Sequence, residues 1–164
     1  MSDETAQIRP YRDSDGAGVI ELARQLQSNE HALFERMTPP GDIGEWYLEA
    51  ITRQCLDNDG RILVAEHGGR VVGYATVLTR IVQDEIDETE YEYAQIGDLV
   101  VSADARRQGL GARLIEACER IATDAGARWL RISVLARNEA AVQLYQARGF
   151  APHLMELEKP LERE

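Results

Sequence analysis

The sequence predicts a mixed α/β fold in a single domain that spans residues 1–164. Stretches in which apolar and polar residues alternate, as in strands, are interspersed with stretches in which apolar residues recur every three or four positions, as in amphipathic helices. The 164 residues and 44% hydrophobic content suit one domain with its own core. We find no internal repeat, linker or low-complexity stretch, and therefore expect no second domain.

The first third of the chain predicts a short strand at residues 8–11, followed by two helices. Asp13 or Ser14 is expected to cap the first helix, because short polar side chains accept hydrogen bonds from the free N–H groups of a first turn. Residues 31–42 include a Pro-Pro pair and are expected to form a loop. The apolar stripes of the helices are Val19, Leu22, Ala23 and Leu26, then Ile43, Trp46, Tyr47, Ala50 and Ile51.

A β-hairpin is the clearest local signal. Residues 61–67 and 70–78 are rich in β-branched residues, and Gly68-Gly69 between them suits a two-residue turn. A third β-run covers residues 93–101. This run leads into the glycine-containing loop that follows it.

The last third of the chain alternates helices with strands. A helix follows residue 109, with apolar residues at helical spacing, and Gly126 is expected to end it. A strand is predicted at 129–135, a helix between Asn138 as cap and Gly149 as stop, and a last strand at 154–158.

Charge and composition exclude several classes of protein. The net charge of −11 argues against a nucleic-acid partner, because such proteins normally carry a basic stripe. The excess acid includes residues 84–92, which we interpret either as a solvated loop or as a surface facing a cationic acceptor, whereas residues 104–148 hold eight arginines against five acids. No apolar run approaches membrane-spanning length and no signal peptide is evident, so we expect no membrane partner. Cys55 and Cys118 lack metal-ligand spacing and suit buried thiols in the cytoplasm.

The stretch 98–112 carries the most functional information. An apolar strand runs into Arg106-x-x-Gly109-x-Gly111 and then into a helix. The free N–H groups at a helix start attract phosphate, the glycines remove Cβ atoms that would keep a ligand off the backbone, and the arginine side chains add positive charge. The spacing fits neither Gly-x-Gly-x-x-Gly nor a Walker A loop. The alternative is a tight strand-to-helix turn without a ligand.

These residues resemble the pyrophosphate-binding signature of the GNAT family of N-acetyltransferases. Residues 138–150, a capped helix that carries a tyrosine and ends in Gly-Phe, are similar to a second element of that family. The resemblance implies a central, mostly antiparallel, twisted sheet of about six to seven strands flanked by about four helices. It also implies acetyl-CoA as co-substrate, no metal, and a reaction without a covalent enzyme intermediate.

The resemblance assigns the coenzyme-binding residues. The backbone of the strand segment Leu99, Val100 and Val101 is implied to bind the pantetheine arm and the acetyl carbonyl. The loop is implied to bind the pyrophosphate, and Asn138 is implied to contact the pantetheine arm. Asparagine is also a favoured N-cap residue in helices that bind no ligand. Tyr145 corresponds to the frequent general acid near the coenzyme sulfur, although a tyrosine on an amphipathic helix is often only a core residue. The loop residues are Arg106, Arg107, Gln108, Gly109, Leu110, Gly111 and Ala112.

A base is needed because only a neutral amine attacks a thioester, and an amine of pKa about 10.4 is neutral in roughly one molecule in 2,500 at pH 7. Asp98 is the best placed candidate. Strict alternation puts the Asp98 side chain on the face opposite Leu99, so the direction in which it points depends on whether a bulge shifts the register of the strand. An ordinary solvent-facing or loop-capping aspartate is equally compatible with the sequence. Glu92 and Gln95 are alternatives. The three histidines are scattered and predict no catalytic role.

The resulting hypothesis is an acetyl-CoA-dependent N-acetyltransferase in which a primary amine attacks directly in a ternary complex. A small amine is the first choice of acceptor. A protein N-terminus or lysine, or a non-catalytic acyl-CoA-binding regulatory module, are the alternatives. In the family, acceptor choice depends on segments equivalent to about 31–46 and 83–93, and a homodimer with the last strands as a candidate edge is compatible with it.

Overall fold

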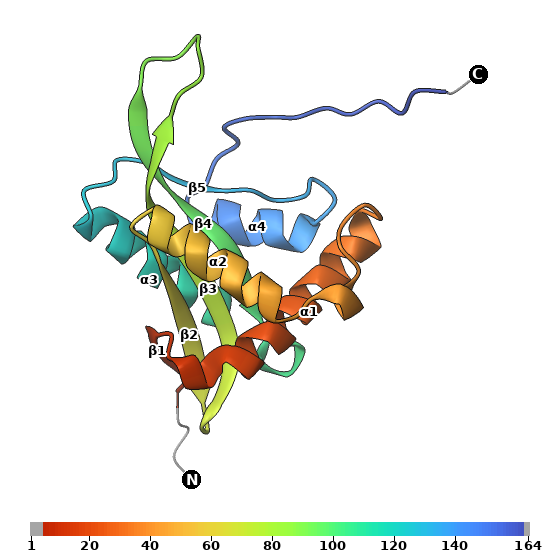
Figure 1. The fold of residues 1–164 in the computed structure, drawn as a ribbon, viewed down its shortest axis with the longest axis vertical. Coiled ribbons are helices and arrows are strands. Elements are labelled where there is room, and N and C mark those ends of the chain that lie inside the picture. The colour runs from red at the N-terminus through yellow and green to blue at the C-terminus, as the bar shows by residue number, and fades with distance from the viewer. Residues whose placement is uncertain (1–4, 163–164) are drawn as a thin grey trace.

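Five strands form one sheet in the order β1-β2-β3-β4-β5 (Figure 1). The structure, a computed structural model, describes residues 5–162. The strands are β1 Gln7–Pro10, β2 Arg61–His67, β3 Arg70–Gln83, β4 Tyr91–Val101 and β5 Leu130–Ile132. The helices are α1 Gly16–Leu33, α2 Glu45–Asp57, α3 Leu110–Asp124 and α4 Glu139–Ala147. Neighbouring strands are antiparallel except β4 and β5, which are parallel.

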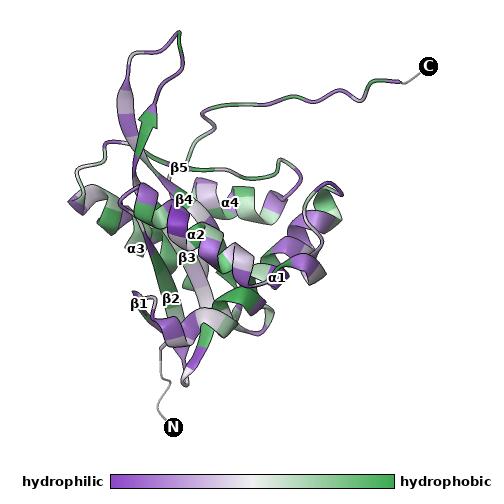
Figure 2. Cartoon of the chain, viewed as in Figure 1, coloured by the Kyte–Doolittle hydropathy of each residue, from purple (hydrophilic) through white to green (hydrophobic). Residues whose placement is uncertain are grey.

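Each face of the sheet has its own core, because successive side chains of a strand point to opposite faces. Helices α1 and α2 pack on one face, where Tyr74 and Val100 are buried. Helix α3 and part of α4 cover the other face around Leu114. In Figure 2 strand β2 is largely hydrophobic, and the helices carry both hydrophobic and hydrophilic residues along their length. The mixed α/β class expected from the sequence is confirmed.

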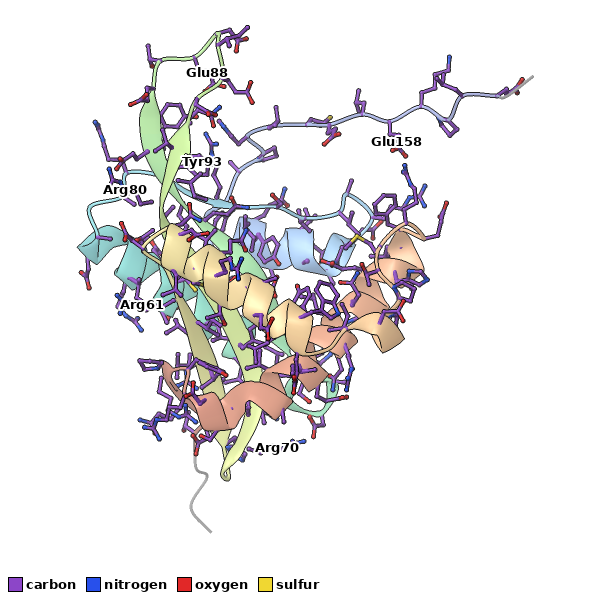
Figure 3. All side chains as sticks on the ribbon, in the orientation of Figure 1. Arg61, Arg70, Arg80, Glu88, Tyr93 and Glu158 are labelled. Carbon is purple, nitrogen blue, oxygen red and sulfur yellow. The ribbon has the colours of Figure 1, made fainter. Side chains whose placement is uncertain are left out.

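The β2–β3 hairpin and the β3–β4 hairpin differ in how far they extend from the body of the protein. Gly68 and Gly69 both have positive φ, at 56° and 74°, which is the conformation that a tight two-residue hairpin needs. Strands β3 and β4 run past the body of the protein as an arm, and Figure 3 shows Glu88 at its tip. Residues 84–90 of the acidic run are therefore exposed at the end of this arm. This position favours the interpretation as a solvated loop.

Three local predictions differ from the structure. Asp13 and Ser14 belong to a short 3-10 turn, and Asp15 instead accepts hydrogen bonds from the Arg12 N–H at 2.8 Å and from the Arg9 guanidinium. Strand β5 has three residues, because the chain leaves β4 after Ile132. Residues 154–158 are not a strand, because they lie beside no other strand with which to form hydrogen bonds. The sheet therefore has five strands in the described residues instead of six to seven.

Two predictions about composition can be compared with the structure. Cys55 and Cys118 are free and buried, as expected. Burial raises the pKa of the Cys118 thiol to about 12, which leaves it unreactive at neutral pH. Within residues 5–162, every helix is too short or too polar to cross a membrane.

Candidate active site

A β-bulge in β4 sets the geometry of the candidate site. Ala75 pairs with Leu99 and Val77 pairs with Ile96, so the single residue Thr76 lies opposite both Gly97 and Asp98. The Asp98 N–H donates to the Thr76 Oγ1 at 2.8 Å, in place of a regular ladder bond. A Cβ on residue 97 would lie 2.6 Å from the same Oγ1 atom, so any other residue there would displace Thr76 or the strand.

The bulge determines the face on which Asp98 lies. Counting regular alternation from Ile96 would put residue 98 on the α3 face. The extra residue moves Asp98 to the α1/α2 face, while Leu99 and Val101 pack against the α3 core. The bulge thus lies before Asp98, and Asp98 stays on the face opposite Leu99, as strict alternation between these two residues predicts.

Strand β4 has an open edge next to the bulge. In the described residues its pairing with β5 ends at Ile96, whereas its pairing with β3 continues to Val101. The Ser102 N–H donates to the Val72 carbonyl on the β3 side. Backbone N–H and C=O groups alternate in direction along a strand, so those of Leu99 and Val101 point to the open edge of β4.

Val100 differs from its two neighbours in the strand. Its backbone groups face β3, since it lies directly opposite Tyr74 and its carbonyl oxygen would be 3.0 Å from a Cβ added to Gly73. This corrects the expectation that all three residues of the segment offer backbone groups to a coenzyme. Two of the three remain at the open edge.

The loop after β4 leads into an uncapped helix start. No side chain caps the first turn of α3, and Gly109, its N-cap, has a φ of 73°. Arg107 also has a positive φ, 64°, which is uncommon for a residue other than glycine. Arg106, Arg107 and Gln108 are exposed, and the Arg106 Nε donates to the Val101 carbonyl oxygen at 3.2 Å. The loop therefore presents free N–H groups beside two arginines, as an anion site requires.

The two glycines of this loop serve different purposes. A Cβ on Gly109 would meet nothing within 4 Å, so its requirement for glycine comes from the positive φ. A Cβ on Gly111 would lie 3.2 Å from the Leu144 Cδ2 on α4. Gly111 therefore also allows α3 and α4 to approach each other, and the expectation that both glycines make room for a ligand stays a prediction.

Helix α4 brings Asn138 and Tyr145 to the same side of the sheet as α3. The Asn138 Oδ1 accepts a hydrogen bond from the Ala141 N–H at 3.3 Å, which confirms the predicted cap. The helix ends where Gly149 adopts a φ of 92°. Tyr145 is partly buried against Phe150, with 6.1 Å between the ring centroids. Burial, followed by the charge of Glu30, raises the pKa of Tyr145 to about 12.

An acid–tyrosine cluster lies on the α1/α2 face, and its members are Glu30, Tyr47, Tyr74 and Asp98. The Asp98 Oδ2 accepts hydrogen bonds from the Tyr47 hydroxyl at 2.9 Å and from the Tyr74 hydroxyl at 2.7 Å. Burial raises the pKa of Asp98, and the two hydroxyl groups partly offset that effect. Burial and the nearby Asp98 charge raise the pKa of Glu30 as well.

Sequence reasoning missed Glu30, although a signal was present. The apolar stripe of α1 continues with the same spacing to Gln27, which is buried, and to Glu30, which is partly buried. Polar residues on a buried stripe indicate a polar neighbour across the interface. The alternative base Glu92 lies elsewhere, on the exposed arm, where it accepts from the Arg80 Nε at 2.8 Å. Gln95 pairs with Leu78, on the opposite side of the bulge from Asp98.

The sequence model of the Acetyltransferase (GNAT) family matches residues 20–150. The chain belongs to the GNAT family. Its members are acetyltransferases, and curated relatives along most of the chain bear N-acetyltransferase names, so the chain is an N-acetyltransferase. The uncharacterized N-acetyltransferase YhfO of Bacillus subtilis is 27% identical over 143 residues, which cover 87% of this chain and 88% of the relative. The thialysine N-epsilon-acetyltransferase of Bos taurus is 29% identical over 148 residues, covering 87% and 82%.

Solved structures share the fold of this GNAT chain. A variant of the BH1408 protein of Bacillus halodurans superimposes with a TM-score of 0.80 at 19% identity, covering 95% of this chain and 99% of the other. The AAC(6')-Iy structure, which holds a bisubstrate analogue of CoA and acetylneamine, superimposes with a TM-score of 0.71 at 19% identity and the same coverage. At these identities the likeness concerns the fold.

Proposed function

We propose that the protein transfers the acetyl group of acetyl-CoA to a primary amine by direct attack in a ternary complex. The observation that carries the proposal is the position of the anion-binding helix start beside the open edge of β4, with the acid–tyrosine cluster on the opposite face of the same strand. A phosphate-bearing coenzyme and a cationic acceptor would meet there.

The coenzyme would lie along α3 and β4. The N–H groups from Arg107 to Ala112 and the two arginine side chains would bind the pyrophosphate, since helix starts and guanidinium groups both favour phosphate. The open-edge groups of Leu99 and Val101, together with Asn138, would bind the pantetheine arm. An N–H of this edge would also polarise the thioester carbonyl as negative charge develops on its oxygen.

The amine would approach from the α1/α2 face. Two carboxylates attract a protonated amine. The Asp98 charge raises the pKa of Glu30, and the Glu30 charge raises the pKa of Tyr145, so Glu30 lies near both residues. Asp98 would accept the amine proton directly or through water. Its raised pKa strengthens it as a base, because the gap to an amine of pKa about 10.4 becomes smaller.

Tyr145 would act on the departing sulfur. A phenol of pKa about 12 stays protonated at neutral pH. Complete transfer of its proton to a thiolate of pKa about 8.5 would be uphill by roughly 5 kcal/mol, at 1.36 kcal/mol per pKa unit. Its role would therefore begin as a hydrogen bond that stabilises the thiolate. A bound amine cation would offset the Glu30 charge and make Tyr145 a stronger acid.

A small amine is the proposed acceptor, with a protein or peptide amine as the alternative. The Bos taurus relative is named for thialysine, and the AAC(6')-Iy ligand carries an acetylated amino compound, which supports amines of low molecular weight. The acidic run 84–92 contributes less to this choice than the cluster, because residues 84–90 lie at the tip of the arm. We also propose a cytoplasmic location, supported by the two free buried cysteines.

Calorimetric titration with acetyl-CoA tests the coenzyme half of the proposal. The wild-type protein is expected to bind one equivalent, and Gly109→Val is expected to lose at least tenfold in affinity, because valine disfavours a φ of 73° and rearranges the loop. No binding by the wild type would overturn this site.

A matched pair of α1 variants tests the acceptor half. Glu30→Gln is expected to raise the KM for the amine while leaving acetyl-CoA affinity unchanged. Glu21→Gln, on the same helix but with a side chain 62% exposed, is the control. Equal KM values for the two variants would remove the acceptor role of Glu30.

A further inference from the structure

The Arg106 side chain contacts the same strand edge that the proposed function gives to the coenzyme. Its Nε donates a hydrogen bond to the Val101 carbonyl oxygen at 3.2 Å. The backbone groups of Val101 point to the open edge of β4, because the pairing of β4 with β5 ends at Ile96 in the described residues. The guanidinium group therefore lies on a backbone acceptor that the pantetheine arm would use.

A short backbone turn brings Arg106 to this position. Ala103–Ala105 form a 3-10 turn directly after β4, and the chain leaves the turn at residue 106, beside the end of the strand. Ala105, the last residue of the turn, is 7% exposed and packs in the core between the sheet and α3. The place from which the Arg106 side chain starts is thus set by a turn that is anchored in the core.

The positive charge of Arg106 is available to an anion. Within residues 5–162, neither Arg106 nor its neighbour Arg107 forms a salt bridge with an acid, and both side chains are exposed. A guanidinium group matches the charge and the paired oxygens of a phosphate, whereas the Val101 carbonyl is a single neutral acceptor. A diphosphate at the start of α3 would therefore draw Arg106 away from Val101.

We propose that Arg106 selects acyl donors that carry a diphosphate. On the Val101 carbonyl, Arg106 competes with the pantetheine arm for that acceptor and for space along the open edge. A donor with a diphosphate moves the guanidinium group onto its phosphates and frees the edge, whereas a donor made of pantetheine alone has no group that moves it. The inference rests on the proposed function and adds a role for the coenzyme phosphates in admitting the pantetheine arm.

Titration with two fragments of the coenzyme tests the selection without any catalysis. Pantetheine represents the arm, and ADP represents the diphosphate end. In the wild-type protein, saturating ADP is expected to tighten pantetheine binding by roughly twofold to tenfold, the range that one net hydrogen bond corresponds to. By linkage, saturating pantetheine tightens ADP binding by the same factor. Fragments that bind the wild type independently of each other would overturn the proposal.

Two substitutions at position 106 separate the contact with Val101 from the charge. Arg106→Ala removes both, whereas Arg106→Gln removes the charge but keeps an N–H donor, because the glutamine Nε2 is as many bonds from the backbone as the arginine Nε. Pantetheine alone is expected to bind Arg106→Ala roughly twofold to tenfold more tightly than the wild type, and Arg106→Gln no more tightly than the wild type. Equal pantetheine affinities of Arg106→Ala and the wild type would overturn the proposal.

Arg107→Ala is the matched control in the same loop. It removes an equal charge, whereas the hydrogen bond to Val101 comes from Arg106, so Arg107→Ala is expected to weaken ADP binding without tightening pantetheine binding. Tighter pantetheine binding by this control would show a general effect of charge and would overturn the role of Arg106.

The use of two acyl donors separates this inference from the proposed function. For Arg106→Ala, kcat/KM is expected to fall with acetyl-CoA and to rise with S-acetylpantetheine, relative to the wild type. A wild type that releases no thiol from acetyl-CoA with any amine would refute the proposed function. An active wild type, with an Arg106→Ala variant that gains nothing with S-acetylpantetheine, would refute only the selection by Arg106.

Discussion

Replacing Gly97 by alanine tests the bulge that places Asp98. The added Cβ would lie 2.6 Å from the Thr76 Oγ1, closer than such atoms approach in proteins, so the threonine or the strand must move. That Oγ1 is the acceptor for the Asp98 N–H at 2.8 Å, and Thr76 is only 1% exposed. Overpacking together with the loss of this buried hydrogen bond is expected to cost about 2–3 kcal/mol.

Thermal denaturation and acetylation rate measure the effect together. For a domain of this length, about 2–3 kcal/mol lowers the melting temperature by roughly 4–12 °C. Gly41→Ala is the control, because its added Cβ meets nothing within 4 Å, and its effect is expected to stay within about 0.5 kcal/mol. Thr76→Ala in the Gly97→Ala background removes the clashing atom and is expected to recover part of the lost stability.

Two results would refute this reasoning. The first is a Gly97→Ala protein that melts like the wild type and acetylates amines at the same rate. The second is strict additivity of the Gly97→Ala and Thr76→Ala effects, because atoms in direct contact should show a coupling energy.

Further substitutions test individual residues. Tyr145→Phe is expected to keep acetyl-CoA affinity and to lower kcat by about 10²-fold, and single-turnover kinetics with a normal rate would contradict its role at the sulfur. Asp98 must be ionised to act as a base, so kcat/KM should fall as the pH drops through its raised pKa, at a higher pH than for an ordinary carboxyl group. Asp98→Asn should abolish that limb of the pH profile, and an unchanged profile would exclude it as the base. Leu114→Ala, at a site with 0% exposure, should destabilise the fold by about 2–5 kcal/mol in urea denaturation, and a loss below about 1 kcal/mol would contradict its place in the core.

The elements that local chemistry determines could be predicted from the sequence. The Gly68-Gly69 turn needs two residues with positive φ, and these residues supply them. The Asn138 cap and the glycine-rich start of α3 follow in the same way from groups within a few residues of each other. Predictions of this kind need no knowledge of distant contacts.

The features that depend on residues distant in the chain could be predicted only in part. A glycine within a strand pattern indicates a bulge, but the residue opposite Gly97 becomes known only from the pairing of β3 with β4. Glu30 joins the candidate site because α1 packs beside the strand that carries Asp98, 68 positions later in the chain. Residues 154–158 have the composition of a strand, yet a strand also requires a neighbour, which their own chain does not provide in the described structure.

Amine-dependent release of CoA from acetyl-CoA is the most direct test of the central claim. Purified protein would be incubated with acetyl-CoA and a panel of small amines, amino acids and peptides, while free thiol is followed and the acceptor is weighed by mass spectrometry. The expected result is thiol release only when an amine is present, matched by one acetyl group added to that amine. Thiol release at the same rate without any amine, or binding of acetyl-CoA with no acetylated product across the panel, would contradict the proposed reaction.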